Sequence, residues 1–593
     1  MPENKNIKKI ISSPVVHALL IYISSGWIVL EMTDYFISHY DLTERFRDIL
    51  LIIMIVGLPI ALFLTWMFTR EKQIEEEKGA GVFKVLLKRP WFSIPGIIVI
   101  ALLIFSAARF VYQHQPQTMD SENAYPYLTE AMRQAGPEIS LAVLPFTSLT
   151  GSSEQDWMVS GQHESLIHEL ARISQIRPLR IISKSTVDAF KNYEKPVSEI
   201  AREIDVDYLV EASVLPSEDS VTLQLRLIHL VPEETVVWAE TSSSDFSHIL
   251  RFHSNIAQQI ARRINLSLTP DEEERFGTHR EINPECYKAY LRGMYNLNLL
   301  TPEGMETGIE YLHQAVSIDP AEPFAHAGLA LGYLELAHSP LDPGDALTKA
   351  EASASQAFKL DTSMAEIYTA LGEVYLYESW KFDLAREYLE KALRINPNLA
   401  ITHYHYAWAL YLFGDTEGAI REHLLAQKYD PFNPLHYAWM GILYNSNGQM
   451  DEAIDVTLES FEIRPDYPAG YFVLGLTYLL EGKPEEAIET HQKLSELYPW
   501  WSWGLGYTYA VTGHTAEAEE IVNQLESVEP NNWIAVGLTQ IYAGLGRMDE
   551  AFKWLNYEPH HAFTAWAAVQ PEYSEMRKDP RFEDFLARLD LPD

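Results

Sequence analysis

Two pairs of closely spaced histidines are the side chains in this sequence that most resemble metal ligands. They are His403 with His405 and His560 with His561, and imidazole nitrogen is a common zinc ligand. Neither pair has a third His, Cys, Asp or Glu at a spacing typical of a metal site. We therefore interpret both pairs as structural histidines and expect no metal.

A second polar cluster, Asp156, His163 and Glu164, offers the residue types of acid–base catalysis. The cluster falls at the start of a predicted helix, where polar side chains usually act as caps. The sequence also contains no phosphate-binding loop, dinucleotide glycine fingerprint, GxSxG elbow, HExxH or EF-hand pattern. We expect a non-enzymatic protein without catalytic residues or cofactor, and an enzyme that uses this cluster is the alternative.

The charge of the chain argues against a nucleic-acid partner. Its 593 residues include 83 acidic and 45 basic side chains, which gives a formal net charge of −38. Acid spread over a folded surface repels the phosphates of DNA and RNA. The single cysteine, Cys286, excludes an internal disulfide and any CxxC pair.

The C-terminal half repeats itself with a fixed period. Pro397, Pro431, Pro465 and Pro499 lie 34 residues apart, and this period is the tetratricopeptide signature. Glycines recur in the turns, for example Gly414, which suits a helix end with positive φ. We expect roughly seven units over residues 284–556, the first two irregular, followed by a capping segment at 557–593.

Aromatic residues fall at the helix positions that line the inner groove of such an array. These positions are 2, 5, 9 and 12 of the first helix in each unit, and the predicted protein-binding residues there are Tyr404, Trp408, Tyr411, Phe472, Trp500, Trp503 and Tyr507. One unit between them has no aromatic residue at these positions and offers Leu435, Ala438, Ile442 and Asn445 instead. Aromatic anchors suit a groove that holds a peptide or helix. The alternative is that the rings pack between neighbouring helices.

A smaller unit over residues 139–269 mixes strand and helix patterns. Predicted strands include residues 179–183, 208–215, 221–229 and 235–241, with helices at 161–173, 197–204 and 247–264. This order predicts one α/β domain with helices packed on a sheet. Residues 112–138, rich in Gln, Ser, Asn and Pro, form the predicted linker before it.

The N-terminal part predicts a membrane segment over residues 15–111. Residues 49–68 contain twenty residues without a charge, enough to cross a bilayer, and two flanking apolar runs suggest three transmembrane helices in all. Basic residues concentrate in the tail at 1–14 and in the loop at 70–89. Because such residues stay in the cytoplasm, we expect a cytoplasmic N-terminus and a long C-terminal part outside it.

Several ordered motifs carry a family resemblance: VLPF at 143–146, ISKSTVDAF at 182–190, IAREIDVDYLVEASV at 200–214 and VWAE at 237–240. The domain at 139–269 resembles the TolB amino-terminal-like domain of bacterial envelope proteins, with a departure at Ala212, where glycine is common. The sequence GLPIALFLTW at 57–66 is similar to the anchor of such proteins. The resemblance implies a multi-pass protein of the bacterial inner membrane with its C-terminal domains in the periplasm.

Together these observations predict a multidomain fold: three N-terminal transmembrane helices, a small α/β (TolB amino-terminal-like) domain and an all-α tetratricopeptide superhelix. The function we expect is that of a membrane-anchored periplasmic scaffold or assembly factor that binds proteins or peptides through the array. The alternative is a sensory or regulatory membrane protein that couples a periplasmic signal to a separate cytoplasmic effector chain.

Overall fold

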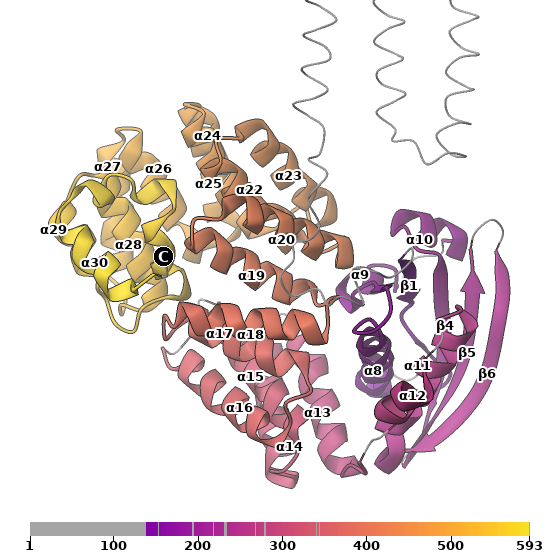
Figure 1. The fold of residues 1–593 in the computed structure, drawn as a ribbon. Coiled ribbons are helices and arrows are strands. Elements are labelled where there is room, and N and C mark those ends of the chain that lie inside the picture. Colours follow the sequence, from indigo (N-terminus) through magenta and orange to yellow (C-terminus); the bar gives the residue numbers. More distant parts are fainter. Residues whose placement is uncertain are drawn as a thin grey trace, which may run out of the picture. The chain divides into compact units, whose positions relative to one another are not determined.

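The computed structural model describes residues 138–591, apart from positions 152, 192–194, 218, 231–233, 267, 278–279, 300, 340 and 343. Within this part a sheet domain is followed by an array of paired helices (Figure 1). The domain and the array belong to one compact unit.

The sheet runs in the order β3-β1-β4-β5-β6, and β2 pairs with β4. Strands β3, β1 and β4 are parallel, whereas β4, β5 and β6 form an antiparallel meander. The strands are β1 (Ile139–Val143), β2 (Thr147–Ser148), β3 (Leu179–Ile181), β4 (Tyr208–Pro216), β5 (Ser220–His229) and β6 (Thr235–Asp245). Four of them begin and end within about four residues of the predicted ranges.

Helices pack on both faces of the sheet because successive strand residues point to opposite sides. Leu141 and Val143 contact the apolar cluster of α8 (Asp156–Ile173) and α11 (Ile249–Arg263). Ala142 and Leu144 join the cluster on the other face with α9 (Lys184–Asp188) and α10 (Val197–Glu203). The short helix α12 (Pro270–Gly277) then leads to the array.

Among the described residues the array contains eight consecutive helix pairs, against the roughly seven units that the sequence predicted. Helices α21 and α22 together form the first helix of the fifth pair. The helices are α13 (Pro284–Leu297), α14 (Pro302–Ile318), α15 (Pro323–Ala337), α16 (Ala346–Leu360), α17 (Ala365–Tyr377), α18 (Phe382–Ile395), α19 (Ala400–Leu412), α20 (Thr416–Tyr429), α21 (Pro434–Ala438), α22 (Met440–Ser446), α23 (Met450–Ile463), α24 (Pro468–Leu480), α25 (Pro484–Leu497), α26 (Trp503–Val511), α27 (Thr515–Glu526), α28 (Asn532–Gly544) and α29 (Met548–Leu555).

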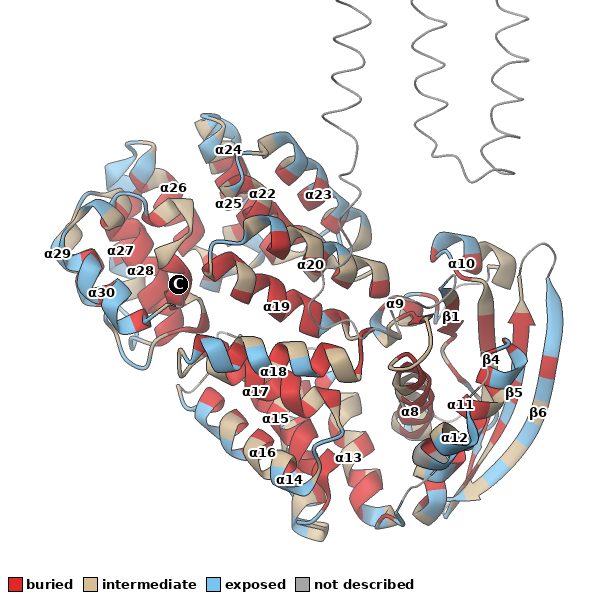
Figure 2. Cartoon of the chain, in the orientation of Figure 1, coloured by how far each residue is buried: buried red, intermediate tan, exposed pale blue. Residues whose placement is uncertain are grey.

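Small residues allow the two helices of a pair to approach closely. A Cβ atom on Gly372 would lie 2.7 Å from Leu389 Cγ, so no larger residue fits between α17 and α18. The first helix of a pair is more deeply buried than the second, as α17 and α18 illustrate (Figure 2). The core of the array therefore runs along its first helices.

After α29 the chain does not continue the repeat. Residues 557–591, hereafter the C-terminal segment, form three short 3₁₀ turns, η4 (Ala562–Ala568), η5 (Pro571–Tyr573) and η6 (Met576–Lys578), and then α30 (Arg581–Leu589). Phe582 and Phe585 of α30 are buried, whereas Leu586 is exposed.

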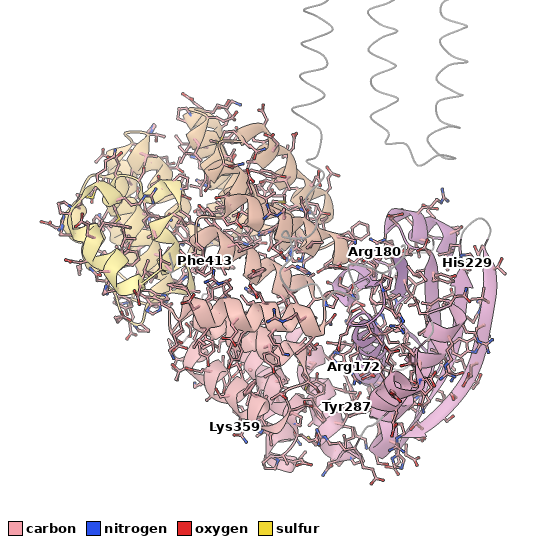
Figure 3. All side chains as sticks on the ribbon, viewed as in Figure 1. Arg172, Arg180, His229, Tyr287, Lys359 and Phe413 are labelled. Atoms are coloured by element: carbon pink, nitrogen blue, oxygen red, sulfur yellow. The ribbon has the colours of Figure 1, made fainter. Side chains whose placement is uncertain are left out.

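The sheet domain is docked on the array through loops that end two repeats. The Asn398 side chain pairs with the backbone of the edge strand β3, accepting from Ile181 N at 3.2 Å and donating to Leu179 O at 3.1 Å. Helix α8 also packs against α13, where Ser165 Oγ and Tyr287 Oη are 2.8 Å apart. Tyr287 and Arg172 lie at this boundary (Figure 3).

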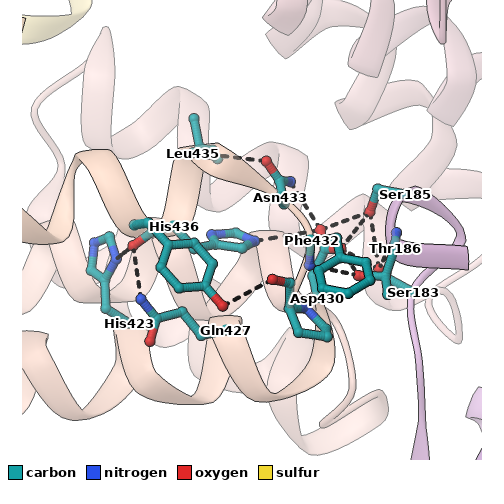
Figure 4. A network of polar contacts seen from close by, with 12 residues as sticks. Ser183, Ser185, Thr186, His423, Gln427, Asp430, Phe432, Asn433, Leu435 and His436 are labelled. Carbon is teal, nitrogen blue, oxygen red and sulfur yellow. Dashed lines mark hydrogen bonds and ion pairs between the residues drawn. The ribbon is translucent and has the colours of Figure 1, made fainter. Parts of the chain in front are cut away.

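Asp430 is the central residue of a second interdomain contact (Figure 4). Its carboxylate accepts hydrogen bonds from the hydroxyls of Ser183, Ser185 and Thr186 at the start of α9, the latter two at 2.7 Å. His436 Nε2 lies 3.5 Å from Asp430 Oδ2. Burial raises the Asp430 pKa, but His436 and the hydroxyls outweigh burial and hold the pKa well below its usual value.

The predicted fold class needs one correction. The three transmembrane helices expected within residues 15–111 lie outside the described residues, and in the part that is described no helix is both long and apolar enough to cross a bilayer. Even α8, with 18 residues, carries charged side chains such as Asp156 and Arg172. The fold shown is a small sheet domain followed by an all-helical superhelix.

Candidate functional site

Six of the seven aromatic residues expected to line the groove are buried in this conformation. Only Trp500, with 49% of its surface exposed, is open to solvent. The buried residues are Tyr404, Trp408, Tyr411, Phe472, Trp503 and Tyr507. Where they lie decides whether any of them can meet a partner.

The first cluster is formed by the aromatic residues of α19. Tyr404 packs edge-on to His423 of α20, with ring centroids 5.4 Å apart, and so lies between helices. Trp408 extends further and meets Trp439 at 5.9 Å. Tyr411 Oη bonds Ser446 Oγ at 2.6 Å. Tyr404 therefore packs between helices, as the alternative interpretation predicted. Trp408 contacts the C-terminal segment, which the sequence did not predict to lie there.

The second cluster, around α24 and α26, is also packed. Phe472 lies 5.0 Å from Trp503 and 5.7 Å from Trp501. Trp503 in turn meets Trp533 of α28 at 5.8 Å. These rings fill the space between successive repeats, so in this conformation they contact one another and not a partner.

Part of the inner groove is filled by the C-terminal segment. Trp566 is almost completely buried and packs perpendicular to Trp408 at 5.7 Å and beside Tyr377 at 5.2 Å. Its indole N–H donates to the Trp408 carbonyl at 3.3 Å, and Phe563 lies 5.5 Å from Trp439. The chain thus supplies its own aromatic occupant. Sequence reasoning missed this occupant because the segment has no periodicity, although its aromatic content was a signal.

Beyond Trp566 the groove stays open as a cavity of about 500 Å³. Its walls come from α22, α24 and α26 on one side and from η5 on the other. Ile442, Asn445 and Tyr507 line it and occupy groove positions that the sequence identified. Hereafter this space is called the groove cavity.

The groove cavity is lined by several polar side chains, among them Asn445 and Glu572. Glu572 faces it from the C-terminal segment, and burial raises the pKa of this carboxyl to about 7. Within the described chain, Glu572 Oε2 and Asn445 Oδ1 are buried without a hydrogen-bond partner. Buried polar atoms are almost always paired, so an unpaired acceptor marks a place for a ligand or water.

Of the described histidines considered as metal ligands, His403 and His405 have hydrogen-bond partners, whereas His560 Nε2 and His561 Nε2 are buried without one. His403 Nδ1 lies 2.7 Å from Glu422 Oε2, and its Nε2 bonds the Pro397 carbonyl at 2.9 Å. His405 Nδ1 lies 2.8 Å from Tyr377 Oη. Among described residues no group of three His, Cys, Asp or Glu could hold a metal ion.

The cluster considered for acid–base chemistry is divided by the fold. His163 points into the sheet domain, where a ring nitrogen meets the Val143 carbonyl at 2.7 Å, and burial lowers its pKa to about 4. Glu164, the next residue along α8, lines a cavity together with residues of the array. Asp156 begins the helix. The three side chains do not form one site.

A second cavity, of about 510 Å³, lies between the sheet domain and the array. Tyr287, Tyr290 and Phe324 line it from the array, and Glu164 and His168 line it from α8. It is hereafter called the interdomain cavity.

An ion pair crosses the interdomain cavity. His168 Nδ1 lies 3.1 Å from Glu366 Oε1 of α17. Burial lowers the pKa of His168, but the charge and hydrogen bond of Glu366 outweigh it and raise the pKa to about 9. The interdomain cavity is therefore bordered by a positive charge on the sheet domain, at His168, and a negative charge on the array, at Glu366.

Comparison with known proteins agrees with the division into two parts. Residues 365–399 match the tetratricopeptide repeat family, and with the eight helix pairs this identifies the C-terminal part as a tetratricopeptide array. Residues 137–260 match the second domain of HilA/YgeH-like transcriptional regulators. The TolB likeness of this domain stays a prediction.

Curated relatives match parts of the chain only. The transcriptional regulator HilA of Salmonella typhimurium is 26% identical over 304 residues, which are 49% of this chain and 51% of HilA. A putative adenylate cyclase 3 of Rhizobium meliloti is 26% identical over 192 residues, 32% of each chain. The chain spans about half or less of the length of these relatives.

Solved structures similar to part of this chain include a tetratricopeptide protein and yeast Tom70. A thermophilic tetratricopeptide protein from Thermus thermophilus has 18% identity and a TM-score of 0.29, covering 33% of this chain and 99% of its own. Yeast Tom70 has 16% identity and a TM-score of 0.35, covering 52% and 69%.

Proposed function

We propose that this protein is a scaffold that holds other proteins in the inner groove of its tetratricopeptide array. The observation that supports this function is the groove cavity, which is lined by the groove positions of three successive repeats. Repeat arrays use such concave surfaces for binding because each repeat adds a similar strip of side chains. The C-terminal segment narrows the groove and leaves this part open.

Site-specific crosslinking in cells tests the scaffold function. A photoreactive residue at Val511, which lines the groove cavity and is 43% exposed, should capture a defined protein partner. The control position is Leu424 on α20, which is similarly exposed and does not line the cavity. Equal capture from both positions, or none from Val511, would contradict the proposal.

A second candidate function is that of a sensory or regulatory protein that passes a ligand signal to a separate effector chain. It is favoured by the interdomain cavity, since a ligand there would contact both domains, and by the partial similarity to a transcriptional regulator and a putative adenylate cyclase. The test is mass spectrometry of small molecules released from the purified full chain. A ligand lost with Leu331→Trp, which fills the cavity, but kept with the exposed control Leu341→Trp would support it; no released ligand would count against it.

The periplasm is the proposed site of action of the sheet domain and the array. The absence of Lys and Arg from positions 112–132, against the basic residues at 70–89, motivates it. Reporter fusions after Arg89 and after Asp120 test it. A reporter active only in the periplasm should work after Asp120 and fail after Arg89.

A further inference from the structure

The groove cavity combines apolar walls with two hydrogen-bond acceptors. The array contributes Ile442, Leu476 and Leu479, which leave a long space free of charge along α22 and α24. Asn445 lies in the same wall, and Glu572 faces it from the C-terminal segment. Both are acceptors that lack a partner within the described residues.

The orientation of the Asn445 amide follows from its other bond. Its Nδ2 donates to Thr477 Oγ1 at 2.9 Å, so the unpaired atom is the oxygen. Thr477 Oγ1 uses its own proton for the Val473 carbonyl at 2.9 Å. Asn445 Oδ1 therefore needs a hydrogen-bond donor from a ligand. The side chain is 4% exposed, and its bond to Thr477 fixes the direction of this oxygen.

The nearest cation of the chain is engaged elsewhere. Arg577 Nη1 donates to the carbonyls of Ala567 at 2.9 Å and Gln570 at 2.7 Å, and so fastens the C-terminal segment. Burial raises the pKa of Glu572 and the charge of Arg577 lowers it, but within the described chain the two side chains form no ion pair and Glu572 Oε2 accepts no hydrogen bond. A carboxylate oxygen that is buried without a direct partner favours a cationic ligand, because the cation replaces lost hydration.

We infer that the groove cavity receives the lysine or arginine side chain of an extended segment of a protein partner. The aliphatic stem of such a side chain suits the walls formed by Leu476 and Leu479, while its charged head reaches Glu572 and Asn445. This inference rests on the proposed function of the groove and adds the chemistry of the partner. Acidic segments are excluded by the same carboxylate.

Selection of a random library of 12-residue peptides on the full chain tests this inference. Selected peptides should share a Lys or Arg at one position. A synthetic copy should bind about tenfold or more weakly to Glu572→Gln, since a charge-assisted hydrogen bond is lost. The matched control is Glu575→Gln, three residues away, exposed and paired with Lys578, which should bind as the wild type does.

A double-mutant cycle gives the decisive comparison. The peptide with its basic residue changed to Gln should bind weakly to the wild type, and Glu572→Gln should cause no further loss. Equal binding of both peptides to the wild type, or unchanged binding by Glu572→Gln, would overturn the inference. Thermal unfolding of the variant verifies that it is folded.

Val511→Arg separates failure of this inference from failure of the proposed function. The substitution places a cation at the mouth of the groove cavity, and Val528→Arg is the control at an exposed site outside it. Peptides that lose binding to Val511→Arg but carry no shared basic residue overturn the inference alone. If the selected peptides bind Val511→Arg and Val528→Arg equally, the proposed scaffold function of the groove is overturned as well. The same conclusion follows if no peptide is selected.

Discussion

The indole N–H of Trp566 donates a hydrogen bond to the backbone carbonyl of Trp408, which lies 158 residues earlier in the chain. The contact joins the C-terminal segment to the first helix of the fourth helix pair. Because Trp566 also packs on Tyr377, the segment fastens neighbouring repeats to each other. The C-terminal segment therefore holds two neighbouring repeats of the array together.

Trp566→Ala should destabilise the array strongly. The substitution removes a large side chain that is only 1% exposed, and such changes cost about 3–5 kcal/mol in free energy of unfolding. Thermal unfolding followed by circular dichroism measures the loss. Trp500→Ala, at the half-exposed tryptophan, should stay within about 0.5 kcal/mol of the wild type. Equal melting of the two variants would show that the C-terminal segment does not stabilise the fold.

Asp430→Ala should loosen the sheet domain from the array. Three hydroxyls on α9 would lose their charged acceptor, at a cost of about 3 kcal/mol. Limited proteolysis between the two parts should become faster. Asp466→Ala, at an exposed loop aspartate paired with Arg464, is the control that should leave the cleavage rate unchanged.

Because of Asp430, we expect the folded protein to lose stability in acid. The pKa of Asp430 is lower in the folded state than in the unfolded state, so the unfolded state takes up the proton first. Its contribution is present above about pH 4 and is lost as pH falls below that value. Urea unfolding at pH 5 and pH 3 should show a smaller drop for Asp430→Asn than for the wild type.

Because of His168, we expect the folded protein to lose stability at alkaline pH. Its pKa in the folded state is about 9, above the ordinary value of 6.5, because Glu366 outweighs the effect of burial. The stability that the ion pair contributes is complete below about pH 6.5 and is lost as pH rises through 9. Between these values His168→Gln should lose less stability than the wild type. His514→Gln, at an exposed position, should behave like the wild type.

Glu572→Gln should stabilise the folded protein at alkaline pH. Burial raises the Glu572 pKa to about 7 from 4.5, so the folded state holds its proton longer and the wild type loses stability as pH rises through this range. The titratable groups nearby are Arg577, Tyr411, Tyr507 and Tyr573. At pH 8 the variant should be more stable by on the order of 2 kcal/mol, and near pH 4.5 equally stable. A less stable variant at pH 8 would indicate a counter-ion for Glu572.

Local sequence patterns were enough to predict most strands of the sheet domain and most helix pairs of the array. The 34-residue spacing and the small residues follow from how two helices of one repeat must touch, and so can be read from short distances in the chain. Strand β1 alternates between two buried faces, and this produces the continuous apolar run at residues 141–144.

The contents of the groove depend on contacts that no local pattern encodes. Trp566 and Trp408 meet across more than a hundred residues, and the C-terminal segment is built of 3₁₀ turns without period. Tyr404 and Trp408 lie on one helix and both contact His423, yet Trp408 also packs against Trp566. Whether an aromatic residue lines a groove or fills it is decided by such distant neighbours.

The bond between Asn398 and β3 has a consequence for self-association. A free edge strand is a template on which another chain can add a strand, and such addition leads to aggregation. Asn398 uses a backbone amide and a carbonyl of β3, so this edge of the sheet is capped by the array. The opposite edge of the sheet is β6, where Val236 and Val237 are exposed. Intermolecular β-pairing of this protein should therefore begin at β6.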